Sequence, residues 1–155
     1  MQFADIIGQK ETKQQLAELV QHNRLSHALL FLGKEGSGSL SLAIAFAQYV
    51  VCEKVNGGKS GVGSQESGPS LFGEPENSNV EPPTLNDSCG VCPACQKAQQ
   101  LIHPDIHFSY PTVTKKPGEK PVATDFITDW REFVKLSPYG NSYDWIEQIK
   151  EKENS

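Results

Sequence analysis

Hydrophobic residues recur along this chain with a period that changes from one segment to the next. Over residues 10–21 the apolar positions return to one face at helical spacing, which predicts an amphipathic helix. Residues 28–32 are apolar throughout, as in a strand that is covered on both faces. From about Leu40 to Val51 the chain is apolar nearly all round, which predicts a buried helix.

The second half of the chain also contains predicted helices and a predicted strand. A short helix is predicted from Pro93 to about Leu101, and residues 105–110 have the pattern of a second strand that ends at Pro111. A helix over about residues 125–136 is followed by a last amphipathic segment. The apolar stripes of these two segments are typical of core packing rather than of a ligand platform. They consist of Phe126, Trp130, Phe133, Val134, Trp145, Ile146 and Ile149.

Strands and helices in this order predict the α/β class. Two strands alone make a marginal sheet, so the chain is either an unusual small domain or an N-terminal fragment of a longer protein, and we favour the fragment. Four parts are predicted: a strand and helices around a glycine-rich loop in residues 1–53, a flexible insertion in 54–87, a cysteine module in 88–103, and a second strand with amphipathic helices in 104–155. The insertion is rich in Gly, Ser, Pro, Asn and Glu, a composition that is typical of disorder.

Charge and composition limit the binding partners and the cellular compartment that we expect for this chain. The net charge of −5 on 155 residues argues against a general electrostatic grip on DNA or on an anionic membrane. No apolar run approaches the roughly 20 residues that span a bilayer, and the first residues lack the pattern of a signal peptide. We therefore expect a cytoplasmic protein. Thiols stay reduced in that compartment, so clustered cysteines are expected to hold metal.

The chain has four cysteines: Cys52, Cys89, Cys92 and Cys95. The last three stand in C-x-x-C-x-x-C spacing, which lets a tight turn direct thiolates at one point, and the first lies at the end of the predicted buried helix. Four thiolates without an open position predict a structural zinc site. The competing ligands are His103 and His107, although four cysteines already complete a tetrahedron. Two disulfides or an iron–sulfur cluster are the alternatives; the reducing compartment disfavours the disulfides and the spacing disfavours the cluster.

The segment Gly33–Leu40 lies between the first predicted strand and the buried helix. Its outer glycines, Gly33 and Gly38, keep the spacing of the phosphate loop G-x-x-x-x-G-K-[ST], but Ser39 stands at the lysine position and Leu40 at the position of the magnesium-binding hydroxyl. The pattern therefore predicts a degenerate phosphate loop, made of Gly33, Gly36, Gly38, Ser39 and Leu40. The alternative is a glycine-rich turn between strand and helix that is unrelated to phosphate loops.

The two replaced positions carry the chemistry of such a loop. The lysine reaches the β- and γ-phosphates and the hydroxyl holds Mg²⁺, while backbone N–H groups still point at an anion. Each charge-assisted bond is worth roughly 1.5–3 kcal/mol net, so losing both groups costs several orders of magnitude in nucleotide affinity. Lys34 lies too early in the loop to substitute, and Ser41 lies one residue beyond the magnesium position. We therefore expect no catalytic residues in this chain.

Several segments together resemble one family. Phe3–Gln9 and Arg24–Phe31 resemble the segments that lead into the phosphate loop of clamp-loader ATPases of the AAA+ class. The cysteine set is similar to the zinc module of these proteins, and residues 95–105 resemble the link from that module to the next strand. The resemblance covers about residues 1–53 and 88–111. It implies the N-terminal part of a AAA+ P-loop nucleotide-binding fold with an inserted structural zinc module.

Within this family, the degenerate loop implies a non-catalytic scaffold subunit of the replicative DNA polymerase clamp loader. The implied partners are the other clamp-loader subunits and, through the complex, the sliding clamp and primed DNA, with no membrane contact. The implied cofactor is structural zinc, and ATP is not expected to bind well. An arginine that acts in trans on a neighbour's ATP would follow a later strand, and we expect it to lie outside this chain.

Two other functions stay open on the sequence. The first is an active clamp-loader motor ATPase with an altered loop, which would have to work without the lysine that Ser39 replaces. The second is a zinc module that binds nucleic acid, against which the acidic balance of the chain speaks. Nucleotide binding distinguishes the first from the scaffold, and salt-dependent DNA binding distinguishes the second.

Overall fold

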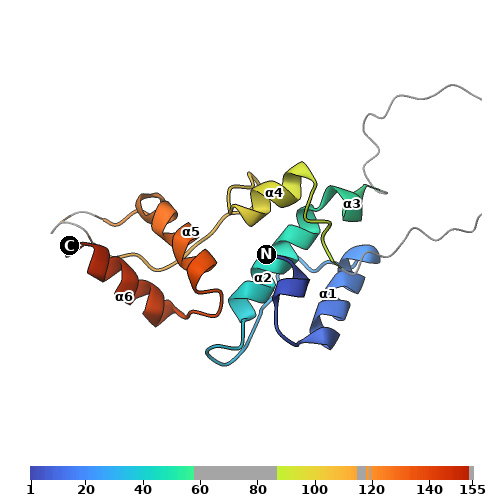
Figure 1. The fold of residues 1–155 in the computed structure, drawn as a ribbon, viewed down its shortest axis with the longest axis horizontal. Coiled ribbons are helices and arrows are strands. Elements are labelled where there is room, and N and C mark those ends of the chain that lie inside the picture. Colours follow the sequence, from blue (N-terminus) through green and yellow to red (C-terminus); the bar gives the residue numbers. More distant parts are fainter. Residues whose placement is uncertain (58–86, 115–117, 119, 154–155) are drawn as a thin grey trace, which may run out of the picture.

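The computed structural model describes residues 1–57, 87–114, 118 and 120–153, and within these ranges every regular element is a helix (Figure 1). Helix α2 lies in the middle, with α1 on one side and the pair α5 and α6 on the other (Figure 1). The elements in chain order are η1 (Phe3–Asp5), α1 (Lys10–Gln21), α2 (Ser39–Val51), α3 (Glu53–Asn56), α4 (Pro93–Gln99), η2 (Ala123–Phe126), α5 (Ile127–Leu136) and α6 (Ser142–Glu153).

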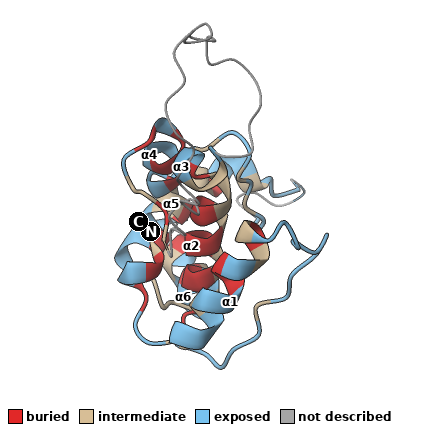
Figure 2. Ribbon diagram, turned by 90° about the vertical axis from the view of Figure 1, so that its right-hand side faces the viewer, coloured by how far each residue is buried: buried red, intermediate tan, exposed pale blue. Residues whose placement is uncertain are grey.

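Helix α2 is the centre of the first core. Its sequence has no charged residue, and most of its residues are buried in the middle of the molecule (Figure 2). The apolar face of α1, with Leu16 and Val20, packs against it, and so does Phe3 of η1, whose ring lies 5.4 Å from that of Tyr49. The helices predicted over residues 10–21 and from Leu40 are thus confirmed, and α2 begins one residue earlier than expected.

An aromatic cluster forms the second core, between α5, α6 and the segment that precedes them. The rings of Tyr110 and Trp130 stack at 4.5 Å, and Trp145 meets Trp130 edge-on at 5.2 Å. The indole N–H of Trp145 donates to the carbonyl oxygen of Pro111 over 2.7 Å, so the one polar group of this fully buried ring is satisfied. The predicted apolar stripes therefore act as core, as expected.

The two predicted strands are wrong for this structure. Residues 28–32 and 105–110 form no strand within the described part of the chain, and Asp105 lies in a turn. Only Phe31 of the first segment packs inward, with its ring 6.0 Å from that of Phe46, while Leu30 and Leu32 are 82% and 84% exposed. An apolar run becomes a strand only where another strand satisfies its N–H and C=O groups, and among the described residues none lies beside it. The α/β class is accordingly not confirmed.

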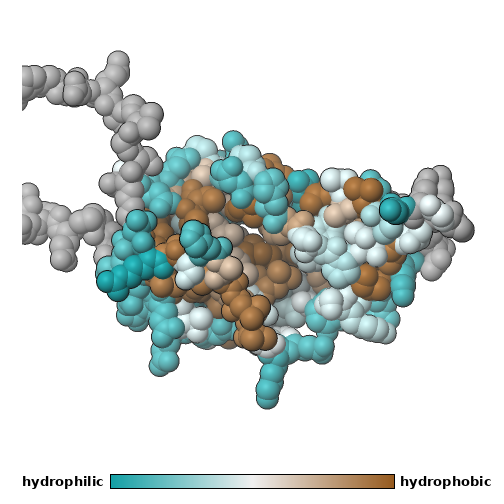
Figure 3. All heavy atoms as spheres, turned by 180° about the vertical axis from the view of Figure 1, so that it is seen from behind, coloured by the Kyte–Doolittle hydropathy of each residue, from teal (hydrophilic) through white to brown (hydrophobic). Residues whose placement is uncertain are grey.

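Apolar side chains gather across the middle of the face opposite the view of Figure 1 (Figure 3).

The predicted helix that starts at Pro93 ends at Gln99 instead of Leu101, and the short α3 was not predicted. Most of the predicted flexible insertion, residues 58–86, lies outside the described residues. Within the described ranges, no helix combines the length and the apolar character that crossing a bilayer requires.

Candidate metal centre and phosphate loop

The structure brings the four cysteines together at one end of α2. Cys52 lies where α2 gives way to α3, and Cys89 comes from the loop before α4. Cys92 caps the N-terminus of α4 and Cys95 sits in its first turn, behind Pro93 at the first helical position. The four Sγ atoms all lie within 4.8 Å of one another. The positions expected from the spacing thus converge on one point.

The distances between the sulfur atoms fit a tetrahedral metal ion. Zn–S bonds of about 2.3 Å place ligand sulfurs about 3.8 Å apart, and the Sγ atoms of Cys89 and Cys95 are 3.9 Å apart. A disulfide needs about 2.05 Å, and all four thiols are free. Neither His103 nor His107 belongs to the cluster. The four cysteines are therefore placed to hold a metal ion such as zinc.

Backbone N–H groups already point at three of the sulfurs. The N–H groups of Cys89, Cys92 and Cys95 donate to the Sγ atoms of Cys52, Cys89 and Cys92 respectively, each over 3.4 Å. Such donors stabilise thiolates and hold ligands in orientation around a metal. The turn is therefore organised around sulfur by its own backbone.

The acidity of the thiols follows from these contacts. Burial by itself raises the pKa of Cys89, but N–H donors from Val91 and Cys92 outweigh it and hold that pKa at about 6. Burial raises the pKa of Cys95, which is fully enclosed beside the other sulfurs. One thiolate is thus ready at neutral pH, and a dication would displace the remaining protons.

The N-terminus of the chain is fastened to the residues just before this cluster. Both carboxylate oxygens of Asp87 accept backbone N–H groups, from Phe3 over 3.0 Å and from Ala4 over 2.9 Å. Behind them, the buried amide of Gln48 donates to the hydroxyl of Ser88 over 3.0 Å. No pattern in the sequence predicted these contacts, because they join residues 40 to 84 positions apart.

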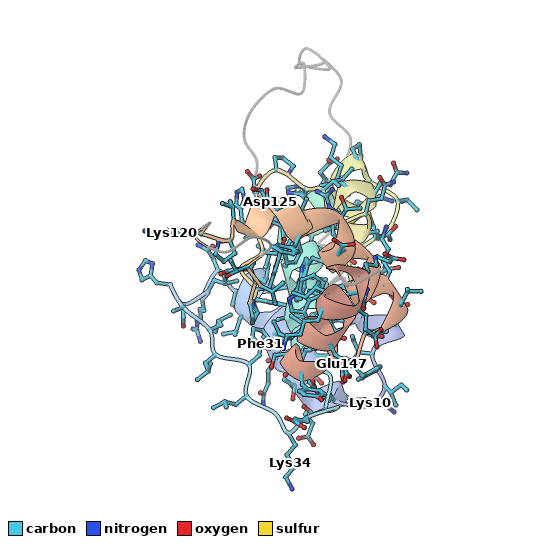
Figure 4. All side chains as sticks on the ribbon, turned by 90° about the vertical axis from the view of Figure 1, so that its left-hand side faces the viewer. Lys10, Phe31, Lys34, Lys120, Asp125 and Glu147 are labelled. Carbon is cyan, nitrogen blue, oxygen red and sulfur yellow. The ribbon has the colours of Figure 1, made fainter. Side chains whose placement is uncertain are left out.

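The glycine-rich loop lies at the opposite end of α2. Gly38 caps the helix in a left-handed conformation, Ser39 is its first residue, and Leu40 is 36% exposed. Lys34 extends away from the body of the molecule (Figure 4). The nearest cation in the sequence is therefore directed away from the helix N-terminus.

Ser41 also fails to supply a metal ligand in this arrangement. Its side chain is fully buried, and its hydroxyl donates to the carbonyl oxygen of Pro138. Because the hydroxyl faces the turn before α6, it is used inside the protein and does not face the mouth of the loop.

A cavity of about 310 Å³ lies between the loop and the aromatic cluster. Loop residues from Gly33 to Leu40 form one wall, and Tyr110, Trp130 and Trp145 contribute to another. Tyr139, in the turn between α5 and α6, lines the same space and lies against Gly38. No motif in the sequence marks Tyr139 as a neighbour of the loop.

Comparison with known proteins finds matches to parts of the chain. A family model described as "DNA polymerase III, delta subunit" matches residues 8–67. DNA polymerase III subunit tau/gamma of Haemophilus influenzae is 44% identical over 50 residues, which make up 32% of this chain and 7% of that protein. No solved structure matches. Both matches are to subunits of DNA polymerase III, and the chain spans only a small part of the length of the tau/gamma subunit.

Proposed function

We propose that this chain is part of a non-catalytic scaffold subunit of a bacterial replicative clamp loader, of the delta-prime kind, and takes part in DNA replication within the DNA polymerase III holoenzyme. The matches to a delta-subunit family model and to a tau/gamma subunit support the loader assignment. The choice of a scaffold rests on the phosphate loop alone.

The observation that carries this choice is the absence, among the described residues, of a cation directed at the start of α2 and of a hydroxyl at the magnesium position, which Leu40 occupies. Ser39 takes the lysine position, Lys34 extends away from the molecule, and the hydroxyl of Ser41 is bound to a carbonyl oxygen. Phosphoryl transfer depends on positioned positive charge, and the described residues offer none at this loop. The loop is thus proposed to keep the shape of a nucleotide site without its activity.

The cysteine cluster is proposed as a structural zinc site held by Cys52, Cys89, Cys92 and Cys95. Four sulfur ligands leave no coordination position for a substrate or an activated water. When bound, zinc would join the end of α2 to the start of α4. Its role is then to fix that end of the domain and not to react.

The proposed partners are the other subunits of the loader, with the sliding clamp and primed DNA reached through the complex. The proposed location is the cytoplasm. The net charge of −5 gives the chain no general attraction for DNA, which is consistent with indirect contact.

A calorimetric titration with ATP and Mg²⁺ tests the scaffold function. We expect no binding tighter than about 1 mM, because each missing charge-assisted contact costs about 1.5–3 kcal/mol. Ser39→Ala is the matched control and is expected to bind ATP as poorly as the natural chain, because a serine hydroxyl supplies no charge at this position. Micromolar affinity in the natural chain, lost in Ser39→Ala, would favour the motor ATPase instead.

Co-purification tests the loader assignment separately. We expect the full-length protein to co-elute in size-exclusion chromatography with the remaining loader subunits of the same organism. If it does not, and instead binds duplex DNA by itself with an affinity that falls steeply with salt, the nucleic-acid-binding alternative is favoured.

A further inference from the structure

We propose that Tyr139 is a built-in cap on the phosphate loop: its ring takes up space beside Gly38, and its hydroxyl binds the backbone N–H of Ile7. The proposal rests on the proposed function, in which the loop holds no nucleotide. It adds that a side chain of the same chain keeps the loop ordered instead. Tyr139 lies in the turn between α5 and α6, about 100 residues beyond the loop.

The ring of Tyr139 lies directly against the backbone of the loop. A methyl group built on Gly38 would come within 2.6 Å of the Cε1 atom and 3.0 Å of the Cδ1 atom of this ring. Only glycine leaves room for so close an approach, and Gly38 also has a φ of +77° that favours glycine. The close contact between Tyr139 and the loop therefore depends on glycine at position 38.

The hydroxyl of Tyr139 extends the contact to the opening segment of the chain. It accepts the backbone N–H of Ile7 over 2.9 Å. The same opening segment reaches the loop a second time, because the side-chain amide of Gln9 donates to the carbonyl oxygen of Ser37 over 2.6 Å. One side chain thus joins the opening segment, the loop and the turn before α6.

A backbone contact fixes the turn that carries the tyrosine. The carbonyl oxygen of Pro138 accepts the hydroxyl of Ser41, which is buried in the first turn of α2. The ring of Tyr139 is therefore held in place through Pro138, the preceding residue, which is bound to α2. An anchored ring over Gly38 leaves less room for a ligand at that point and keeps the loop ordered without one.

Amide hydrogen exchange by NMR on the 155-residue chain tests the cap. Tyr139→Phe keeps the ring and removes the acceptor, so we expect the Ile7 amide to exchange about fivefold faster with little change at the loop. Tyr139→Ala removes both, and the Ser37 amide, which closes the loop turn onto Lys34, is expected to exchange faster as well. Tyr143→Ala, at a tyrosine that is 69% exposed, is the control and should change neither amide.

A pair of glycine substitutions tests the ring contact from the other side. Gly38→Ala and Gly36→Ala face the same backbone cost, with φ of +77° and +73°, but a side chain at Gly36 meets nothing within 4 Å. We expect Gly38→Ala alone to release the Ile7 amide, as Tyr139→Ala does. This pair keeps the test valid if Tyr139→Ala fails to fold.

The outcomes separate this proposal from the proposed function. Unchanged exchange at Ile7 in Tyr139→Phe, or equal effects of the two glycine variants, would overturn the cap whatever the loop binds. Tight ATP binding by the natural chain would overturn the scaffold function, and the exchange data would still report whether the ring covers the loop.

Discussion

Cys92 has two roles at the residue scale, as a candidate metal ligand and as the cap of a helix. Its Sγ atom belongs to the cysteine cluster and also accepts the N–H of Cys95 at the start of α4. Serine is a good helix cap but a poor zinc ligand. A single substitution can therefore separate the two roles.

Replacing Cys92 by serine should keep the cap of α4 and remove one ligand. We expect metal content, measured by mass spectrometry on purified protein, to fall from about one zinc per chain to a small fraction, and unfolding to occur at lower temperature. Adding zinc should raise the midpoint of the natural chain much more than that of Cys92→Ser. Equal metal content in the two proteins would contradict a site with four sulfur ligands.

At the scale of elements, α5 and α6 are held to each other and to residues 110–111 by aromatic contacts more than by ion pairs. Trp145 is fully buried, lies edge-on to Tyr110 and Trp130, and donates to the carbonyl oxygen of Pro111. The ion pairs of Lys152 with α5 are partly exposed and contribute little. The stability of this helix pair should accordingly follow the aromatic cluster.

Shortening Trp145 tests this expectation. Trp145→Ala should lower the free energy of unfolding by about 3–5 kcal/mol, because it leaves a cavity among the rings. Trp145→Phe should cost about 1–3 kcal/mol, mainly through the carbonyl oxygen of Pro111 that loses its donor. Both are measured by urea denaturation. Tyr143→Ala, at an exposed position of the same helix, should stay within about 0.5 kcal/mol of the natural chain.

At the scale of the whole molecule, α2 connects the two candidate sites. The cysteine cluster sits at its C-terminal end and the glycine-rich loop at its N-terminal end. The N-terminal segment spans the same distance, since Phe3 and Ala4 bind Asp87 next to the cysteines while Ile7 binds Tyr139 next to the loop. Loss of metal at one end is therefore expected to loosen the first residues of the chain.

Removing the metal with a chelator tests that link. We expect the amides of Phe3 and Ala4 to exchange faster once metal is removed, because the turn that positions Asp87 loses its support, and the midpoint of thermal unfolding to fall. The same treatment of Cys92→Ser should add little. Unchanged exchange at Phe3 and Ala4 in metal-free protein would show that the two regions are independent.

Secondary structure could be predicted well where a helix provides its own hydrogen bonds. The face of α1, the all-round apolar α2 and the stripe on α5 follow from local periodicity alone. The segments 28–32 and 105–110 could not be settled in this way, since a strand takes its partners from elsewhere in a protein and none lies beside them among the described residues. The pattern of apolar residues therefore wrongly predicted strands there.

Some features of the candidate sites could likewise be predicted from the sequence, and others could not. By itself the sequence determined the cysteine spacing, the glycine-rich loop with a serine at position 39, and the helix ends that carry both, because each is fixed by residue type and short-range geometry. Only the tertiary structure decided that Tyr139 lies on Gly38, that Ser41 faces a carbonyl oxygen and that Asp87 holds the N-terminus. These contacts join segments some 80 to 130 residues apart, and packing in three dimensions selects such pairs without leaving a period or motif in the chain.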